Sequence, residues 1–139
     1  YLHLEPYLHQ LMPAMLTCLV GKRLCESPTE NHWELRDFAA QLAARICRRY
    51  GKEYRDLQPR ITKTLLHAFL DPVKPLTTHY GAIVGLGKMG PLVVQSLLLP
   101  NMVAYLNLLL PELTAANPVK RLEANKCYGA LLVRHIIYI

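Results

Sequence analysis

Apolar residues recur at roughly every third or fourth position along most of this chain, which is the spacing of an amphipathic α-helix. No run of about four to eight residues alternates cleanly between apolar and polar side chains, as a half-buried strand would. The sequence therefore predicts an all-α fold. Helices are expected to begin near residues 4, 32, 57, 77, 91 and 118. The first is expected to bury a stripe of Leu4, Leu8, Leu11, Met15 and Leu19, and the third a stripe of Leu57, Ile61, Leu65 and Phe69.

Proline and glycine mark where some of these helices bend or end. Pro13 has no N–H group and crowds the preceding turn, so the first helix is expected to bend or to begin there. Gly21 is expected to end that helix. Pro100 is expected to divide the apolar segment 91–110 into two short helices.

Short polar residues predict where other helices start. Asn31, with Glu34 three residues later, resembles a capping box at the start of the second helix. Thr77 or Thr78 is expected to cap the fourth helix. Asn117, directly before a proline, is expected to cap the last one.

The helix predicted over 32–50 carries apolar residues on two sides. One stripe is Leu35, Phe38, Leu42 and Ile46, and the other is Trp33, Ala40, Ala44 and Cys47. Burial on two sides suits a helix that lies between neighbours in a stack. Helices joined by short turns and paired as hairpins of about 40 to 50 residues have the spacing of an α-solenoid.

Positive charge is concentrated around the end of the second helix. The chain has 139 residues, enough for one ordinary domain, and its 16 Lys and Arg against 10 Asp and Glu give a formal net charge of +6. The candidate partner-facing residues are Arg45, Arg48, Arg49, Lys52 and Arg55, with Arg60 and Lys63 beyond them. Such an edge is expected to meet an acidic protein surface. Nucleic acid is the alternative, although no base-stacking aromatic spacing, zinc motif or helix-turn-helix signature accompanies the cluster.

Residues 85–90 read G-x-G-x-x-G, the fingerprint of a dinucleotide-binding loop, and residues 82–84 would be its strand. Such a loop needs a parallel sheet with further strands, whereas the residues after Gly90 have helical spacing. Glycines that allow close helix packing are therefore favoured, with nicotinamide cofactor binding as the alternative. No cofactor is predicted.

Residues 89–111 contain no charged side chain and are long enough to cross a bilayer. In a span, Pro100, Asn101 and Asn107 would leave polar groups facing lipid. A pair of helices covered by neighbours on both sides is favoured over a membrane span, and no membrane contact is predicted.

The cysteines and histidines form no recognisable site. Cys18, Cys25, Cys47 and Cys127 make no C-x-x-C pair, which indicates reduced thiols in a reducing compartment. The six histidines lack acids or thiols at ligand spacing. The sequence predicts neither a metal site nor a catalytic constellation.

Four blocks of sequence carry a more specific pattern: LHQLMP at 8–13, NHWELRDFAA at 31–40, LQPRIT at 57–62 and PLTTHYGAIVGL at 75–86. In type and order they resemble the C-terminal HEAT-repeat domain of the TFIID subunit 6 family. The resemblance implies a solenoid of HEAT-like antiparallel helix pairs, with residues 1–139 as a single HEAT-repeat domain.

The same resemblance implies a non-enzymatic nuclear scaffold that supports transcription initiation by RNA polymerase II. Other subunits of TFIID, and in many organisms of the SAGA coactivator, are the implied partners, and a basic module that contacts promoter DNA is the alternative. The family's N-terminal histone fold, which pairs with another subunit, is absent from these residues, so that pairing is not expected of them.

The last residues, 131–139, are more apolar than the capping end of a solenoid should be. We expect this end to pack against another subunit, a further helix or a second copy of the chain.

Overall fold

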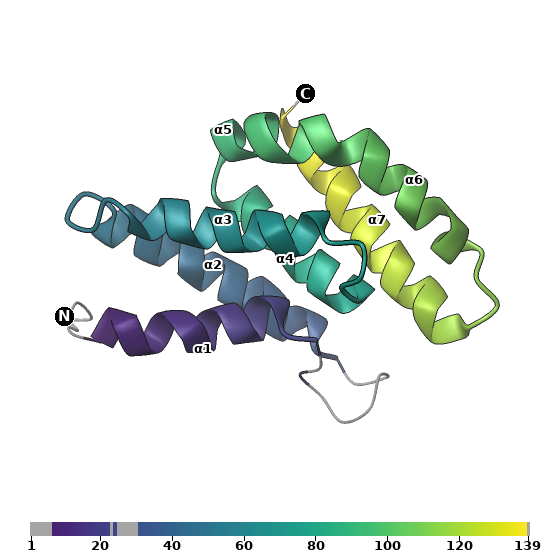
Figure 1. Cartoon of the computed structure of the whole chain (residues 1–139), viewed down its shortest axis with the longest axis horizontal. Helices are drawn as coiled ribbons and strands as arrows, with labels where there is room; N and C mark the ends of the chain where they lie inside the picture. The colour runs from purple at the N-terminus through teal and green to yellow at the C-terminus, as the bar shows by residue number, and fades with distance from the viewer. Residues whose placement is uncertain (1–6, 23, 25–30, 139) are drawn as a thin grey trace.

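The computed structural model describes residues 7–22, 24 and 31–138, and this part of the chain contains helices and no strand (Figure 1). The all-α prediction is confirmed. The elements are α1 (Leu8–Val20), α2 (Trp33–Tyr50), α3 (Leu57–Leu70), α4 (Leu76–Lys88), α5 (Pro91–Val93), the π-helical η2 (Val94–Leu98), the 3-10 turn η3 (Leu99–Asn101), α6 (Met102–Leu113) and α7 (Pro118–Tyr138).

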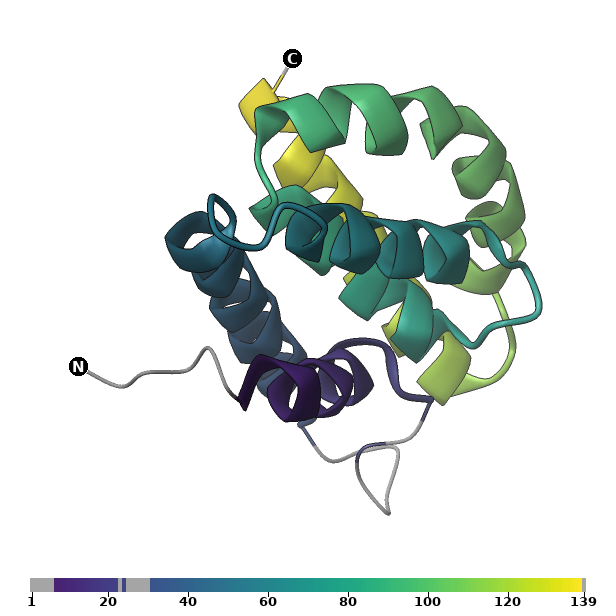
Figure 2. The same ribbon diagram turned by 60° about the vertical axis from the view of Figure 1, so that its left-hand side comes forward.

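The helices pair as antiparallel hairpins that lie side by side, as the solenoid prediction requires. Helix α1 packs on α2, α3 packs on α4, and α6 packs on α7 (Figures 1 and 2). Helix α4 lies in the middle and contacts α1, α2, α3 and α7. The hydrophobic core therefore runs through all three pairs.

Helix α4 is buried on every side, from Thr77 to Gly87. Its glycines let neighbouring helices approach closely. A Cβ atom at Gly81 would overlap the backbone carbonyl of Leu19 on α1, and one at Gly85 would come within 2.8 Å of Leu65 on α3. The alternative of a dinucleotide-binding loop is therefore wrong, because that loop requires a strand at residues 82–84. These residues are helical, and no strand in the described part of the chain leads into Gly85.

Two of the predicted helix starts are confirmed by hydrogen bonds. The side-chain oxygen of Asn31 accepts from the backbone N–H of Glu34 at 3.4 Å. The side-chain oxygen of Asn117 accepts from the N–H of Val119 at 2.9 Å. Both bonds satisfy N–H groups that a helix start leaves without an internal partner.

The threonine cap predicted for α4 is wrong. Helix α4 begins at Leu76, and Thr77 and Thr78 instead donate hydrogen bonds to carbonyl groups at the end of α1, at 3.0 Å to Lys22 and 2.9 Å to Val20. A helix end leaves its last carbonyl groups without internal partners. Thr78 satisfies one of these groups, that of Val20, and Thr77 satisfies the carbonyl of Lys22 in the turn that follows α1.

Helix α1 runs from Leu8 to Val20 with Pro13 inside it, so of the two alternatives for Pro13 a helix start at the proline is wrong. Gly21 follows the helix as predicted. Met15 and Leu19 of the predicted stripe are buried, whereas Leu4 lies outside the described residues.

Helix α3 follows its predicted pattern completely. Leu57, Ile61, Leu65 and Phe69 are all buried. One apolar stripe at helical spacing is enough here because α3 rests on one side of the core and its other faces are open to solvent.

Helix α2 departs from its predicted pattern. The stripe of Trp33, Ala40, Ala44 and Cys47 is buried as expected. In the other stripe Ile46 is buried, but Leu35 is 42% exposed and Phe38 is 62% exposed. Arg36, Ala39 and Ala43 are buried directly beside the first stripe, so α2 buries one broad face against α1 and α4, and the expectation of two buried sides is wrong.

Arg36 is fully buried and joins α2 to the end of α1. Its Nη1 donates to the carbonyl of Leu19 at 2.8 Å, and its Nη2 donates to the carbonyl of Gly21 at 2.7 Å. Its Nε donates to Nδ1 of His32 at 3.0 Å. A buried charge is tolerated when it is hydrogen-bonded in this way.

The segment from Pro91 to Leu113 is one irregular helix rather than two, so the predicted division at Pro100 is wrong. The proline is absorbed by the π-helical and 3-10 turns η2 and η3, and the side-chain amide of Asn101 donates to the carbonyl of Leu97 at 2.7 Å. This bond ties the Asn101 side chain to the backbone of the irregular turn.

That segment is also less covered than predicted. Leu98 and Leu109 are buried, but Leu92 is 76% exposed and Val103 is 72% exposed, so the expectation of neighbours on both sides is wrong. By length and composition alone, Pro91–Leu113 is the one helix within residues 7–22, 24 and 31–138 that would suffice to cross a membrane.

At the C-terminal end Leu131 is buried, and Leu132 and Val133 are exposed on α7. The side chains of residues 134–139, on which the prediction of a covered apolar end mainly rests, lie outside the described residues.

Candidate functional site

The candidate functional site is a groove of about 730 Å³, which we call the basic groove, between the end of α2 and the start of α3. Part of η2 borders it. The lining residues are Cys47, Arg48, Gly51, Lys52, Arg55, Gln58, Pro59, Thr62, Lys63, Leu66 and Leu97.

The turn between α2 and α3 shapes one end of the basic groove. The carbonyl of Tyr50 accepts hydrogen bonds from the N–H groups of Glu53, at 3.2 Å, and Tyr54, at 2.9 Å. These bonds hold residues 51–56 in a compact turn. Lys52 and Arg55 extend from that turn, so their positions relative to the helices are fixed by its backbone.

All the charged residues that line the basic groove are cations: Arg48, Lys52, Arg55 and Lys63. All four are exposed. The nearby carboxylate of Asp56 is turned to Arg60, 3.7 Å from its Nη1 and outside the groove. The groove therefore presents a positive potential that no lining carboxylate offsets.

The floor of the basic groove is apolar. Cys47 is buried, and Leu66 and Leu97 are half-buried against the core. Burial raises the pKa of the Cys47 thiol to about 11, against the opposing effect of the Arg48 charge. The thiol is therefore protonated at neutral pH and is not a nucleophile.

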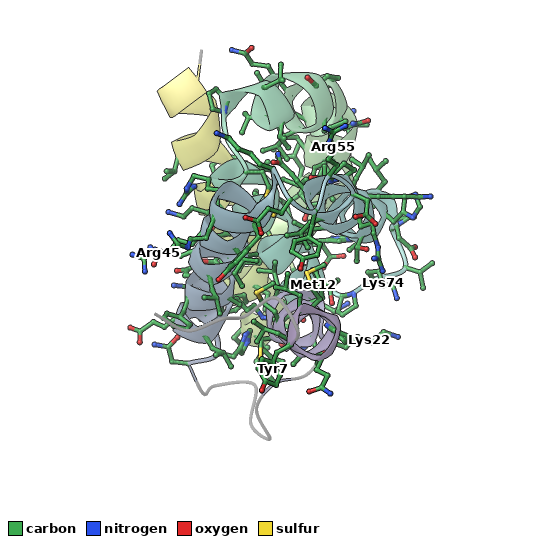
Figure 3. All side chains as sticks on the ribbon, turned by 90° about the vertical axis from the view of Figure 1, so that its left-hand side faces the viewer. Tyr7, Met12, Lys22, Arg45, Arg55 and Lys74 are labelled. Carbon is green, nitrogen blue, oxygen red and sulfur yellow. The ribbon has the colours of Figure 1, made fainter. Side chains whose placement is uncertain are left out.

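The structure brings together three of the five predicted partner-facing residues. Arg48, Lys52 and Arg55 line the basic groove, and Arg48 also lines a smaller hollow of about 250 Å³ together with Arg45 and Lys88. Figure 3 shows Arg45 and Arg55 projecting from opposite sides of the view.

Arg49 is exposed and is not among the residues that line either hollow. Sequence reasoning missed Leu66 and Leu97, which supply the floor. Leu97 comes from another helix pair, and its only sequence signal was its place in an uncharged segment.

The described residues contain no group of three or more His, Cys, Asp or Glu that could hold a metal ion. Cys18, Cys47 and Cys127 are free thiols, and Cys25 lies outside the described residues. Burial raises the pKa of Cys127 to about 12, and its thiol donates to the carbonyl of Leu76 at 3.2 Å. These thiols are part of the core.

Comparison with known proteins decides the family. The model of the TAF6 C-terminal HEAT repeat domain matches residues 1–103. The chain belongs to this family. The match includes α1 to α4 and every residue that lines the basic groove.

The relatives of this HEAT repeat domain are longer proteins. "Transcription initiation factor TFIID subunit 6" of Arabidopsis thaliana is 56% identical over 135 residues, which are 95% of this chain and 25% of that protein. The "SAGA complex/transcription factor TFIID complex subunit Taf6" of Schizosaccharomyces pombe is 49% identical over 131 residues, 94% of this chain and 29% of that protein. The chain thus spans about a quarter of the length of these relatives.

A solved structure supports the fold of the HEAT repeat domain. The TAF6 C-terminal domain from Antonospora locustae superposes with a TM-score of 0.67 at 28% sequence identity, covering 90% of this chain and 58% of that one. The α-solenoid of HEAT-like antiparallel helix pairs is confirmed.

Two histidines of the HEAT repeat domain are buried as neutral groups. Burial, and secondarily the charge of Arg36, lowers the pKa of His32, whose Nδ1 accepts the hydrogen bond from that arginine. Burial also lowers the pKa of His79, against opposing effects of Asp71, whose carbonyl lies 2.8 Å from Nε2. Nδ1 of His79 is buried without a hydrogen-bond partner in the described part of the chain.

These depressed pKa values predict acid lability. The neutral histidines contribute stability that is fully present above their unfolded pKa of about 6.5, and it is lost as the pH falls below that value. Thermal unfolding should therefore show a melting temperature that falls as the pH drops through 6 toward 5. Glu123 has the opposite effect on the pH dependence. Burial raises the pKa of its carboxyl group, so protonation of Glu123 favours the folded state as the pH falls.

A double variant isolates the histidine contribution. The double variant His32→Asn with His79→Gln should flatten the dependence of the melting temperature on pH. The asparagine keeps an acceptor near the place of Nδ1, and the glutamine keeps a donor near the place of Nε2, but neither side chain titrates. His67→Gln, at an exposed position of α3, is the control and should leave the dependence unchanged. An unchanged slope in the double variant would contradict the prediction.

Proposed function

We propose that this chain is a non-enzymatic scaffold domain of a subunit of the general transcription factor TFIID, and that the same subunit also serves the SAGA coactivator. The proposal places the protein in the nucleus, where it supports transcription initiation by RNA polymerase II. The names of the relatives support both complexes, since the fission yeast protein is named as a subunit of each.

The observation that carries the scaffold proposal is the stack of three helix pairs around one continuous core. Stacked pairs expose long outer surfaces to other proteins rather than enclosing a reactive pocket. Burial raises the pKa of the Cys47 thiol to about 11 and that of the Cys127 thiol to about 12, so neither is a thiolate nucleophile at neutral pH. We therefore propose no catalytic residue, no cofactor and no membrane partner.

We further propose that residues 1–139 act as a single HEAT-repeat domain whose partners are other TFIID and SAGA subunits. The histone-fold partner of the full-length protein would bind elsewhere. Within this domain, Arg45, Arg48, Arg49, Lys52 and Arg55 are the proposed partner-facing residues. Promoter DNA is the alternative target of these cations, because phosphates would be attracted by the same charge.

A domain exchange tests the proposed function. In the fission yeast relative, the matching segment is replaced by this chain and the tagged chimera is purified from cells. TFIID and SAGA subunits are expected among the co-purifying proteins by mass spectrometry. The control is the fission yeast protein from which the matching segment is deleted. A folded chimera that recovers no more subunits than this deletion control would contradict the proposal.

A further inference from the structure

We propose that the basic groove binds an acidic peptide segment of a partner protein, with carboxylates on Arg48, Lys52, Arg55 and Lys63 and an apolar side chain on the floor. This inference rests on the proposed function, because it names the chemistry of one partner of the scaffold. It goes further in committing to one groove and one kind of occupant.

The size and shape of the basic groove suit a segment of polypeptide. Its volume of about 730 Å³ lies within the range of binding clefts, about 300 to 1,000 Å³. The floor of Cys47, Leu66 and Leu97 offers apolar contact to a leucine or phenylalanine side chain of such a segment.

Charge complementarity selects an acidic occupant. Arg48 and Lys52 extend from the end of α2 and the turn after it, while Lys63 lies on α3 across the groove. Because no carboxylate of the described residues lines the groove, an occupant with carboxylates would relieve the repulsion between these cations. Arg48 and Arg55 offer forked donors that bind a carboxylate through two parallel hydrogen bonds.

The lining disfavours nucleic acid. Single-stranded nucleic acids bind by stacking bases on aromatic side chains, and no aromatic residue is among those that line the basic groove. A sugar-phosphate backbone would also place polar oxygens over the apolar floor. Those oxygens would lose their bound water, and the apolar floor would not replace the hydrogen bonds that the water had made.

A second groove, between α1 and α3, has a different character. It measures about 300 Å³ and is lined largely by apolar residues, including Leu8, Met12 and Leu16. Its charged residues, Asp56 and Arg60, already form an ion pair with each other. This second groove has no net charge that would favour one kind of partner, so we propose a binding site only in the basic groove.

Selection from a random peptide library displayed on phage tests the proposal on the whole chain. Enriched peptides are expected to combine several Asp or Glu residues with a leucine or an aromatic residue. Their affinity should fall as salt rises. Replacing their acidic residues by amides, or their apolar residue by serine, should weaken binding about tenfold or more.

Variants of the chain locate the binding site. Lys52→Glu with Lys63→Glu should weaken binding of an enriched peptide about tenfold or more. Lys120→Glu with Arg121→Glu makes the same change in net charge at exposed positions of α7, away from the groove, and should change affinity less than about twofold. Circular dichroism confirms that each variant is folded.

Three outcomes would overturn the proposal: no enrichment, enriched peptides without acidic residues, or peptides that bind the groove variant and the control variant equally. A short DNA duplex that binds with the same dependence on Lys52 and Lys63 and displaces the peptide would assign the groove to nucleic acid. If the chimera recovers TFIID and SAGA subunits but the peptide experiment fails, only this inference falls. If the peptide binds the groove but the chimera recovers no TFIID or SAGA subunits beyond the control, the proposed function is wrong instead.

Discussion

Arg36→Met is expected to lower the free energy of unfolding by about 3 to 5 kcal/mol. Removing one partner from a buried, hydrogen-bonded charge generally has an effect of this size. The variant loses the donors to the carbonyl groups of Leu19 and Gly21 and to His32. Methionine fills most of the space but donates no hydrogen bond, so these acceptors are left buried without the arginine. Chemical denaturation and thermal unfolding measure the loss.

A second readout tests whether the arginine acts through its charge. Burial raises the pKa of Glu123, and the charges of Arg36 and Lys120 oppose that rise. In Arg36→Met the pKa of Glu123 should therefore rise further, which NMR titration would detect. Arg45→Met, at an exposed position of the same helix, is the control and should change stability by no more than about 0.5 kcal/mol. Equal stability of the two variants would refute the role of Arg36.

Gly81→Ala is expected to destabilise the protein by about 3 kcal/mol or more, at or beyond the upper end of ordinary overpacking. The new methyl group would overlap the carbonyl of Leu19, which is backbone and cannot rotate away. Helix α1 must then move from α4. The hydrogen bonds that Arg36 and Thr78 make to the end of α1 would lengthen or break with it.

Gly129→Ala is the matched control for Gly81→Ala. Gly129 lies inside α7, and a Cβ atom there would meet nothing within 4 Å. Because glycine in a helix interior is about 0.5 to 1 kcal/mol less favourable than alanine, this variant should be slightly more stable than the original chain. If the two glycine variants have the same melting temperature, the close contact of α1 and α4 is wrong.

Local sequence signals were sufficient where one helix and its own termini decide the structure. The stripe of Leu57, Ile61 and Leu65 predicted the buried face of α3, and Asn117 predicted the start of α7. These features depend on residues within a few turns of each other, so spacing alone identifies them.

The same signals failed where contacts with a distant segment decide the structure. Phe38 is exposed and Arg36 buried because α1 covers the face of α2 that contains the arginine. Hydrophobicity alone ranks those two residues in the opposite order. The threonines predicted to cap α4 likewise turned to carbonyl groups at the end of α1, more than fifty residues away.

The candidate site shows the same division. Sequence reasoning placed Arg48, Lys52 and Arg55 on a partner-facing edge, and the structure groups them around the basic groove with Lys63. It also grouped Arg45 with them, but Arg45 does not line the basic groove and meets only Arg48 of the three, in a smaller hollow. Charge on a helix is visible in sequence, but the side on which a neighbouring helix leaves a hollow is not.

By itself, the sequence determined the all-α class, the positions of most helices and the family, because these follow from periodicity, from residues close together in the chain and from the order of its motifs. Only the tertiary structure decided which face of α2 is buried, that residues 91–113 remain one half-exposed helix, and that Leu97 completes the basic groove. Those outcomes depend on which surfaces of distant helices meet, and apolar spacing limits that choice without fixing it.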